Sequence, residues 1–315
     1  MQKIYPDYYK NFRCIASRCT HNCCIGWEID IDDNTAASYK STEGELGERF
    51  RNNIDFDAIP CHFIHSSHSR CPFLNNNNLC DIITQMGEDS LCDICREHPR
   101  FHNELPGRIE SGLGMCCEEA ARIILTNKNK VKLCVSGEAS QEDEIILLRD
   151  KVLDALQNRT KPIRNRIDDM LALLRTTRAF TDIRTTAKFM LTLERLDDNW
   201  GTMLKELIDT PFEDTAKEFD RYITDSQREY EYEQFAVYII YRHFANAPDL
   251  VEAALVANFA ALCFELMYSL GATAFYKNKE FTTSQQIELC RMFSSEIEYS
   301  DENTDKILDE LYLNI

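Results

Sequence analysis

The stretch FRCIASRCTHNCCIGWEIDID, residues 12–32, opens the most distinctive part of this chain. It contains four cysteines, and eleven of the chain's 14 cysteines lie between Cys14 and Cys117. Short spacings between cysteines let one loop present two sulfurs to one metal, whose binding then contributes to folding. The pattern therefore predicts a metal site built from thiolates.

Three interpretations of these cysteines compete, namely structural disulfides, buried thiols without a role, and metal ligands. The N-terminal sequence MQKIYPDYYKNFRC has neither an apolar run nor a small-residue cleavage site, so we do not expect a signal peptide. A cytoplasmic location follows as the expectation, and thiols stay reduced there. Metal ligation is therefore the favoured interpretation.

The kind of metal centre follows from the spacing. Zinc sites typically use two C-x2-C pairs, and here only Cys92 and Cys95 have that spacing. The spacing of Cys14, Cys19 and Cys23 is irregular, as in many iron–sulfur ligand sets. We expect an iron–sulfur cluster, with zinc as the alternative metal.

The composition limits the class of partner. The 315 residues carry a formal net charge of −18, and 44% of them are hydrophobic. An acidic surface disfavours nucleic-acid binding, which needs clustered Lys and Arg, and it suits solubility or a basic partner. The most apolar segment, 250–276, contains Glu252, Asn258 and Glu265, so we expect a buried core helix and no membrane span.

The cysteine-rich region shows a mixture of short elements. Alternation of Trp27, Ile29 and Ile31 with acidic residues predicts a half-buried strand, and Asp32 is a candidate N-cap for the helix that follows. Apolar periodicity, Gly87 and turn residues predict the remaining elements. These are helices over 43–52, 79–86, 88–98 and 117–126, and a hairpin over 101–113.

The rest of the chain is helical in pattern. Residues 127–143 are polar and are expected to form a linker, and apolar residues then recur at spacings of three and four. The sequence thus predicts a mainly α protein. A small cysteine-rich α+β metal-binding domain over 1–127 is followed by an all-helical domain over 144–315.

Several short motifs resemble those of the flagellin lysine-N-methylase family, and they cover residues 5–125. Glu118 replaces the proline of the family's Cys-Pro-Glu-Ala-Ala-Arg motif, and neither Cys61 nor Cys116 matches a family cysteine. The similar motifs are Phe12-Arg-Cys-Ile-Ala-Ser-Arg-Cys19, Cys23-Cys24-Ile-Gly-Trp27, Asp30-Ile-Asp32, Cys71-Pro-Phe-Leu74, Leu79-Cys80, Gly87-Glu88, Leu91-Cys92, Cys95-Arg96, Pro99-Arg100 and Cys117-Glu118-Glu119-Ala120-Ala121-Arg122.

The resemblance implies a 4Fe–4S cluster and methyl transfer from S-adenosylmethionine to lysines of flagellin or of another protein with exposed lysines. Four thiolates suffice for one cluster, and Cys19, Cys23, Cys95 and Cys117 are the preferred four. The candidate metal ligands are Cys14, Cys19, Cys23, Cys24, Cys71, Cys80, Cys92, Cys95 and Cys117.

Methyl transfer needs a neutral amine, and a carboxylate could accept its proton. Asp30, Asp32 and Glu119 lie near the cysteine motifs and are the candidates, although surface acids and helix caps look the same in sequence. No G-x-G-x-x-G loop follows a strand, so the doubly wound donor-binding fold is not expected. The motif arginines could offset an anionic cluster, hold a carboxylate or form surface ion pairs. They are Arg13, Arg96, Arg100 and Arg122.

The histidines near the cysteines allow a further choice. His62, His65 and His68 could bind metal if that stretch were helical, although exposed loop positions fit them as well. His98 is expected to orient groups around a metal rather than bind it. A non-catalytic iron–sulfur or zinc protein that serves in redox chemistry or docking is the alternative to the enzyme, because a donor-binding motif is missing.

Overall fold

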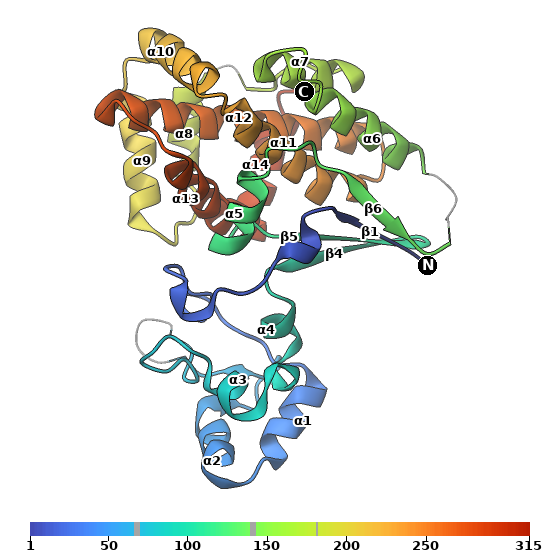
Figure 1. Cartoon of the computed structure of the whole chain (residues 1–315), viewed down its shortest axis with the longest axis vertical. Helices are drawn as coiled ribbons and strands as arrows, with labels where there is room; N and C mark the ends of the chain where they lie inside the picture. Colours follow the sequence, from blue (N-terminus) through green and yellow to red (C-terminus); the bar gives the residue numbers. More distant parts are fainter. Residues whose placement is uncertain (66–69, 139–142, 181) are drawn as a thin grey trace. The chain divides into compact units, whose positions relative to one another are not determined.

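The computed structural model describes residues 1–65, 70–138, 143–180 and 182–315 (Figure 1). Its internal contacts divide the chain into two compact units. Arg13–Phe101 form one, which we call the thiol unit. Met1–Phe12 and His102–Ile315 form the other, which we call the helical unit.

The thiol unit has an aromatic core covered by short elements. Tyr39 and Phe50 stack with ring centroids 4.1 Å apart, and Phe63 and Phe73 pack around them. Asp32 begins the first helix by accepting a hydrogen bond from the Thr35 N–H at 3.0 Å. The elements are η2 (Ala16–Arg18), α1 (Asp33–Ser41), α2 (Gly44–Asn53), β2 (Ile54–Asp55), β3 (His62–Phe63), α3 (Asp81–Met86), η3 (Glu88–Ser90) and α4 (Asp93–Glu97).

A four-stranded sheet begins the helical unit, with strand order β4-β5-β1-β6. The N-terminal strand runs parallel to β5, with Ile4 opposite Glu110, and antiparallel to β6, with Tyr5 opposite Cys134. Gly107, at φ 78°, supplies the left-handed residue of the predicted hairpin turn. The strands are β1 (Gln2–Pro6), β4 (Arg100–Leu105), β5 (Arg108–Leu113) and β6 (Leu133–Ser136), and the turn η1 (Tyr9–Asn11) follows β1.

Two buried helices, α11 and α12, form the centre of the helical unit, and the other helices pack around them (Figure 1). The first buries eleven of its 15 residues, so it carries charged side chains into the interior. The helices are α5 (Glu118–Leu125), α6 (Glu144–Leu156), α7 (Ile163–Leu173), α8 (Ile183–Met190), α9 (Asp198–Asp209), α10 (Phe212–Asp225), α11 (Glu229–His243), η4 (Phe244–Asn246), α12 (Leu250–Asn278), α13 (Thr283–Phe293), the π-helical η5 (Ser294–Glu298) and α14 (Asp301–Tyr312).

Helix α12 is the most apolar helix of the chain. Among the described residues it alone is long and apolar enough to cross a membrane, by length and composition only. In its most apolar 18-residue window, 72% is buried inside the structure. The prediction of a buried core helix is therefore confirmed.

The mainly helical fold class is confirmed, and three local predictions are corrected. Residues 27–32 form no strand, only an isolated bridge between Asp30 and His62, because no neighbouring strand continues the ladder. The predicted linker over 127–143 contains β6, whose pairing with β1 the sequence pattern does not reveal. The predicted helix over 88–98 is split into η3 and α4 by extended backbone at Leu91 and Cys92.

The compact units also differ from the predicted domains 1–127 and 144–315. Residues 1–12 and 102–127 belong to the helical unit, because β1 pairs with both β5 and β6 and α5 packs against α13 and α11. The metal-binding role of the first predicted domain stays a prediction.

The attachment of β5 to α6 depends on a buried ion pair. The carboxylate of Glu110 and the guanidinium of Arg149 pair with side chains 0% and 1% exposed, and Arg108 contacts Glu110 at 3.0 Å. We expect Arg149→Met to lower the free energy of unfolding by about 3 kcal/mol or more, because it leaves a buried charge undercompensated. Chemical denaturation measures this change.

Two variants accompany this measurement. Replacing both partners, as Glu110→Leu with Arg149→Met, should recover part of the loss, because it removes both members of the buried pair and leaves only Arg108 without its contact to Glu110. Lys306→Ala removes the exposed pair with Glu302 and should leave the unfolding midpoint essentially unchanged. An Arg149→Met midpoint equal to that of the wild type would contradict the buried pair.

Candidate functional site

Six thiols come together in the thiol unit. Cys71 and Cys92 lie in its apolar core, and Cys24, Cys80 and Cys95 pack against that core. The backbone N–H of Cys71 donates to the carbonyl of Cys24 at 2.8 Å, which joins two cysteine-bearing loops. Cys23 follows as the direct neighbour of Cys24. We call Cys23, Cys24, Cys71, Cys80, Cys92 and Cys95 the thiol cluster.

Two hydrogen-bonded thiol pairs form part of this cluster. The bond between Cys23 and Cys24 lowers the pKa of Cys23 and raises that of Cys24, and the bond between Cys92 and Cys95 does the same for those two. Each pair therefore releases one proton readily and the second one reluctantly. All four remain free cysteines rather than disulfides.

Of the remaining members, Cys71 interacts electrostatically with both pairs and Cys80 with the Cys23–Cys24 pair. Cys24 interacts with Cys71 and Cys80, and Cys95 interacts with Cys24 and Cys71. Burial raises the pKa of Cys71 to about 11, and burial also raises that of Cys80. The cluster thus holds sulfur donors that a positive charge would convert to thiolates.

The donors of this cluster are all sulfurs, and their setting is partly buried. Such donors are chemically suited to a thiolate-bound metal or an iron–sulfur cluster. Within the part of the chain that the structure describes, no three His, Cys, Asp or Glu side chains have positions that would hold a single metal ion. The convergence of six sulfurs is the observation that supports a metal centre here.

Three of the nine predicted ligands lie outside the thiol cluster. The sulfur of Cys14 accepts from the Ala16 N–H at 3.4 Å, and the thiol of Cys19 donates to the His21 carbonyl at 3.2 Å. Cys117 lies in the helical unit, where it is the N-cap residue of α5. Of the preferred four, Cys23 and Cys95 are in the thiol cluster.

The predicted histidines occupy different environments. His62 lies in β3 and its Nδ1 contacts the Pro60 carbonyl at 3.0 Å, so the helical arrangement of the histidines is wrong. Burial lowers the pKa of His65, and His68 lies outside the described residues. His98 has its ring centroid 5.6 Å from that of Trp27, and burial lowers its pKa to about 4.

Two of the three candidate acids near the cysteine motifs have side-chain partners. The carboxylate of Asp32 accepts from the Thr35 and Asp93 N–H groups, both at 3.0 Å, and its pKa is lowered. Glu119 forms a two-pronged ion pair with Arg122 at 2.7 and 2.6 Å, one turn along α5. Asp30 forms a backbone bridge with His62, which does not involve its carboxylate.

A second group of polar side chains surrounds Glu298 in the helical unit, and the sequence pattern did not predict it. The buried carboxylate accepts from the Tyr238 hydroxyl at 2.9 Å, and it lies 2.9 Å from His243 Nε2 and 3.5 Å from Arg242 Nε. Burial alone would raise the pKa of Glu298, but Arg242 and His243 outweigh burial and hold it below its ordinary value.

This Glu298 network extends to the surface. Arg242 lies 4.9 Å from the ring centroid of Tyr299, and Tyr299, 41% exposed, has its hydroxyl bonded to the thiol of Cys116. Burial raises the pKa of Cys116 to about 12. Gly114 leaves room for this ring, since a Cβ at that position would lie 2.2 Å from the Tyr299 hydroxyl oxygen and would displace it.

The one sequence signal for this network was the apolar but charged segment EYEQFAVYIIYR, which ends at Arg242. Its pairing with Glu298 spans more than fifty residues, and Glu298 lies in a π-helical turn. Such turns are rare and are frequent at functional sites. Neither the long-range pairing nor the turn has a local sequence signature.

The chain thus combines a helical unit, which is built around buried ion pairs, with a compact unit that contains six neighbouring thiols. It is a mainly helical, cysteine-rich protein. Residues 111–314 match the family model described as the FliB lysine N-methylase C-terminal domain. The chain therefore belongs to the FliB lysine N-methylase family. The resemblance inferred from residues 5–125 is confirmed at the family level, and the matching model covers the helical part.

Curated relatives support the same family. The flagellar biosynthetic protein FliU of Salmonella muenchen is 25% identical over 137 residues, which cover 41% of this chain and 79% of that protein. The lysine-N-methylases of Salmonella choleraesuis (strain SC-B67) and Salmonella typhimurium (strain LT2) are each 25% identical over 137 residues. The match spans only 33% of the length of these two. No solved structure gives a significant match.

The Glu298 network leads to a prediction about pH. Because its folded-state pKa is lowered, Glu298 contributes stability above its unfolded-state pKa of about 4.3, and this contribution is lost as the pH falls through the folded-state value. Glu298→Gln should lower the free energy of unfolding by about 3 kcal/mol at neutral pH. The difference from the wild type should shrink below about pH 4.3.

Urea denaturation at several pH values from 7 to about 3 measures this difference. Asp305→Asn changes an exposed carboxylate on α14 and serves as the matched control, with little difference expected at any pH. A Glu298→Gln deficit that stays constant over the whole pH range would show that ionisation of Glu298 is not its source.

Proposed function

We propose that this protein is a lysine N-methyltransferase that transfers methyl groups from S-adenosylmethionine to lysine side chains of a protein, with flagellin as the expected substrate. The match of residues 111–314 to the FliB lysine N-methylase C-terminal domain carries this proposal. The names of the curated relatives, lysine-N-methylase and flagellar biosynthetic protein, support the reaction and the substrate class.

The thiol cluster is the proposed site of a 4Fe–4S cluster, with up to four of its six cysteines as the donors and at most one of these from the adjacent Cys23 and Cys24. Zinc is the alternative metal. A bound 4Fe–4S cluster supplies an electron reservoir and, at an iron without a cysteine, a position for a small-molecule ligand. The six converging sulfurs support this assignment.

In the reaction, the lysine nitrogen forms a bond to the methyl carbon while the bond from that carbon to the sulfonium sulfur breaks. The amine must be neutral, because only then does it have a free electron pair. Asp32 and Glu119 are poor proton acceptors, since their oxygens are engaged in N–H bonds and an ion pair. Glu298 is buried, and its lowered pKa makes it a weak base. We therefore assign the proton to solvent, before methyl transfer, and Asp30 remains as the candidate acceptor within the protein.

This assignment predicts the pH dependence of the activity. If solvent removes the proton, kcat/KM for the protein lysine should rise about tenfold per pH unit between pH 7 and 9, well below the lysine pKa of about 10.4. The assay incubates the full chain, purified without oxygen, with methyl-labelled S-adenosylmethionine and flagellin, and mass spectrometry locates methyl-lysine.

A flagellin whose surface lysines are acetylated is the matched control and should accept no label. Absence of methylation with wild-type flagellin, from protein that retains its metal, would argue against the enzyme and in favour of a non-catalytic metal protein. Activity that is flat from pH 7 to 9 would instead point to a proton acceptor within the protein.

The metal assignment is tested separately. Oxygen-free wild-type protein should contain about four irons and show visible iron–sulfur absorbance. Cys95→Ser should lose most of both, because it removes one sulfur and disrupts the Cys92–Cys95 pair. Cys134→Ser, in β6 of the helical unit, is the matched control and should keep the wild-type iron content.

Iron and zinc are measured by elemental analysis on the same samples. Colourless protein with one zinc per chain would replace the iron–sulfur assignment by zinc. Equal metal content in the wild type and in Cys95→Ser would remove the thiol cluster as the metal site.

A further inference from the structure

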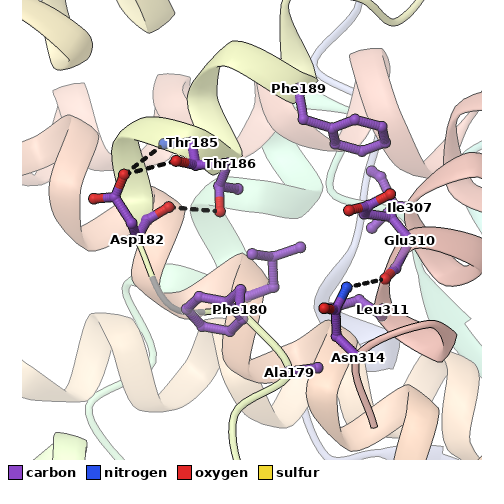
Figure 2. A pocket seen from close by; sticks show the side chains of 11 residues that line it. Ala179, Phe180, Asp182, Thr185, Thr186, Phe189, Ile307, Glu310, Leu311 and Asn314 are labelled. Carbon is purple, nitrogen blue, oxygen red and sulfur yellow. Dashed lines mark hydrogen bonds between the residues drawn. The ribbon is translucent and has the colours of Figure 1, made fainter.

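A cavity of about 160 Å³ opens in the helical unit between α8, α14 and residues 179–180 (Figure 2). Its floor is apolar, with Leu262, Ile307 and Leu311 exposed by 4%, 1% and 3%. An apolar cavity of roughly 150 Å³ can hold a molecule the size of benzene. The space therefore admits one extended alkyl side chain but not a large cofactor.

Aromatic rings and a carboxylate surround the opening. Figure 2 shows Phe180 on one side of the cavity and Phe189 and Glu310 on the other. Among the residues that the structure describes, the carboxylate of Glu310 has no hydrogen-bonding or ion-pair partner, and Asn314 Nδ2 donates to the backbone carbonyl of Glu310 at 2.7 Å. The other acid near the cavity, Asp182, is engaged at the N-cap of α8.

This combination selects a cation with an apolar stem. Aromatic faces attract ammonium and guanidinium groups, and methylated ammonium groups bind well between aromatic rings. Phe180 already has one such neighbour, the guanidinium of Arg178 at 6.0 Å from its ring centroid. The charge of Arg178 is offset by Asp168 at 3.0 Å and Glu265 at 3.5 Å. Glu310 thus remains as the carboxylate that can balance an incoming cation.

We propose that this cavity, the α8–α14 slot, binds the Nε-methylated side chain of a lysine on a protein partner. The four methylenes of the lysine cover the apolar floor, and the methylated ammonium group lies near Phe180, Phe189 and Glu310. Methylation makes the ammonium group larger and less strongly hydrated, so its transfer into an apolar slot costs less than that of an unmodified lysine. The choice of methyl-lysine rests on the proposed function, and the slot would retain the product of the reaction.

The test measures binding of small probes to the full chain by isothermal titration calorimetry. The first probe is Nα-acetyl-Nε,Nε-dimethyl-lysine methylamide, and the second is the unmethylated lysine amide. The third is the neutral norleucine amide, which has an apolar stem but no charge. We expect the dimethyl probe to bind at least about fivefold more tightly than either of the others.

Two variants test whether the probe binds in the α8–α14 slot. Glu310→Gln removes the exposed carboxylate without disturbing the core, and Phe189→Leu replaces the ring by an apolar side chain; each should weaken the dimethyl probe about fivefold. Glu302→Gln changes another exposed acid of α14 and should leave binding unchanged. Thermal unfolding checks that each variant is folded.

The proposal is overturned if the dimethyl probe does not bind, if norleucine amide binds equally well, or if Glu310→Gln and Phe189→Leu both keep wild-type affinity. Methyl transfer to flagellin, measured on the same preparations, separates the two proposals. Transfer without probe binding refutes the slot and leaves the proposed function standing. Probe binding that the variants weaken, without any transfer, supports the slot and counts against the proposed function.

Discussion

The helical unit depends on the arginines that neutralise the carboxylates carried into its interior by α11. Glu231 and Glu233 have side chains 0% exposed, and a buried carboxylate without a partner costs several kcal/mol. Arg228 pairs with Glu231, whereas Arg159 and Arg166 converge on Glu233. The packing of α11 therefore determines where α7 and the segment before it must lie. Glu298 reverses the arrangement, since there the cation comes from α11 and the carboxylate from the π-helical turn.

The thiol unit differs from the helical unit because it holds several sulfurs close together at a small apolar core. Two cluster members, Cys80 and Cys92, are the N-cap residues of α3 and α4, where helix N–H groups can face a sulfur. Backbone N–H groups of Ile82 and Ile83 lower the pKa of Cys80 and partly oppose the effect of burial. The stacked rings of Tyr39 and Phe50 supply the core from which these short helices project. Loops joined only by such contacts would gain stability from a metal that binds all of them.

The sequence predicted what local chemistry determines and missed what distant pairing determines. Asp32 as a cap, Gly87 as a helix end and the hairpin at Gly107 all follow from the conformational preferences of single residues. Cysteine spacing found all six members of the thiol cluster, but it could not separate them from Cys14, Cys19 and Cys117. The pairing of β1 with β6, and the network around Glu298, join segments more than a hundred and more than fifty residues apart, so no periodicity reports them. The predicted strand over 27–32 is wrong for the same reason. Its side chains alternate as expected, but it has no partner strand in the described part of the chain.

The two steps of the proposed reaction, docking of the lysine-bearing partner and methyl transfer to the lysine, have opposite electrostatic requirements. A formal charge of −18 attracts a protein segment that carries lysines, and this attraction weakens as salt is added. The same negative field favours the protonated amine, whereas methyl transfer needs the neutral one. One location cannot satisfy both requirements well. A carboxylate such as Glu310 beside aromatic rings suits a residue that remains charged, whereas the reacting lysine needs surroundings that disfavour its charge. Docking of a methylated lysine in the α8–α14 slot would use the acidic surface without raising the pKa of the lysine that is about to react.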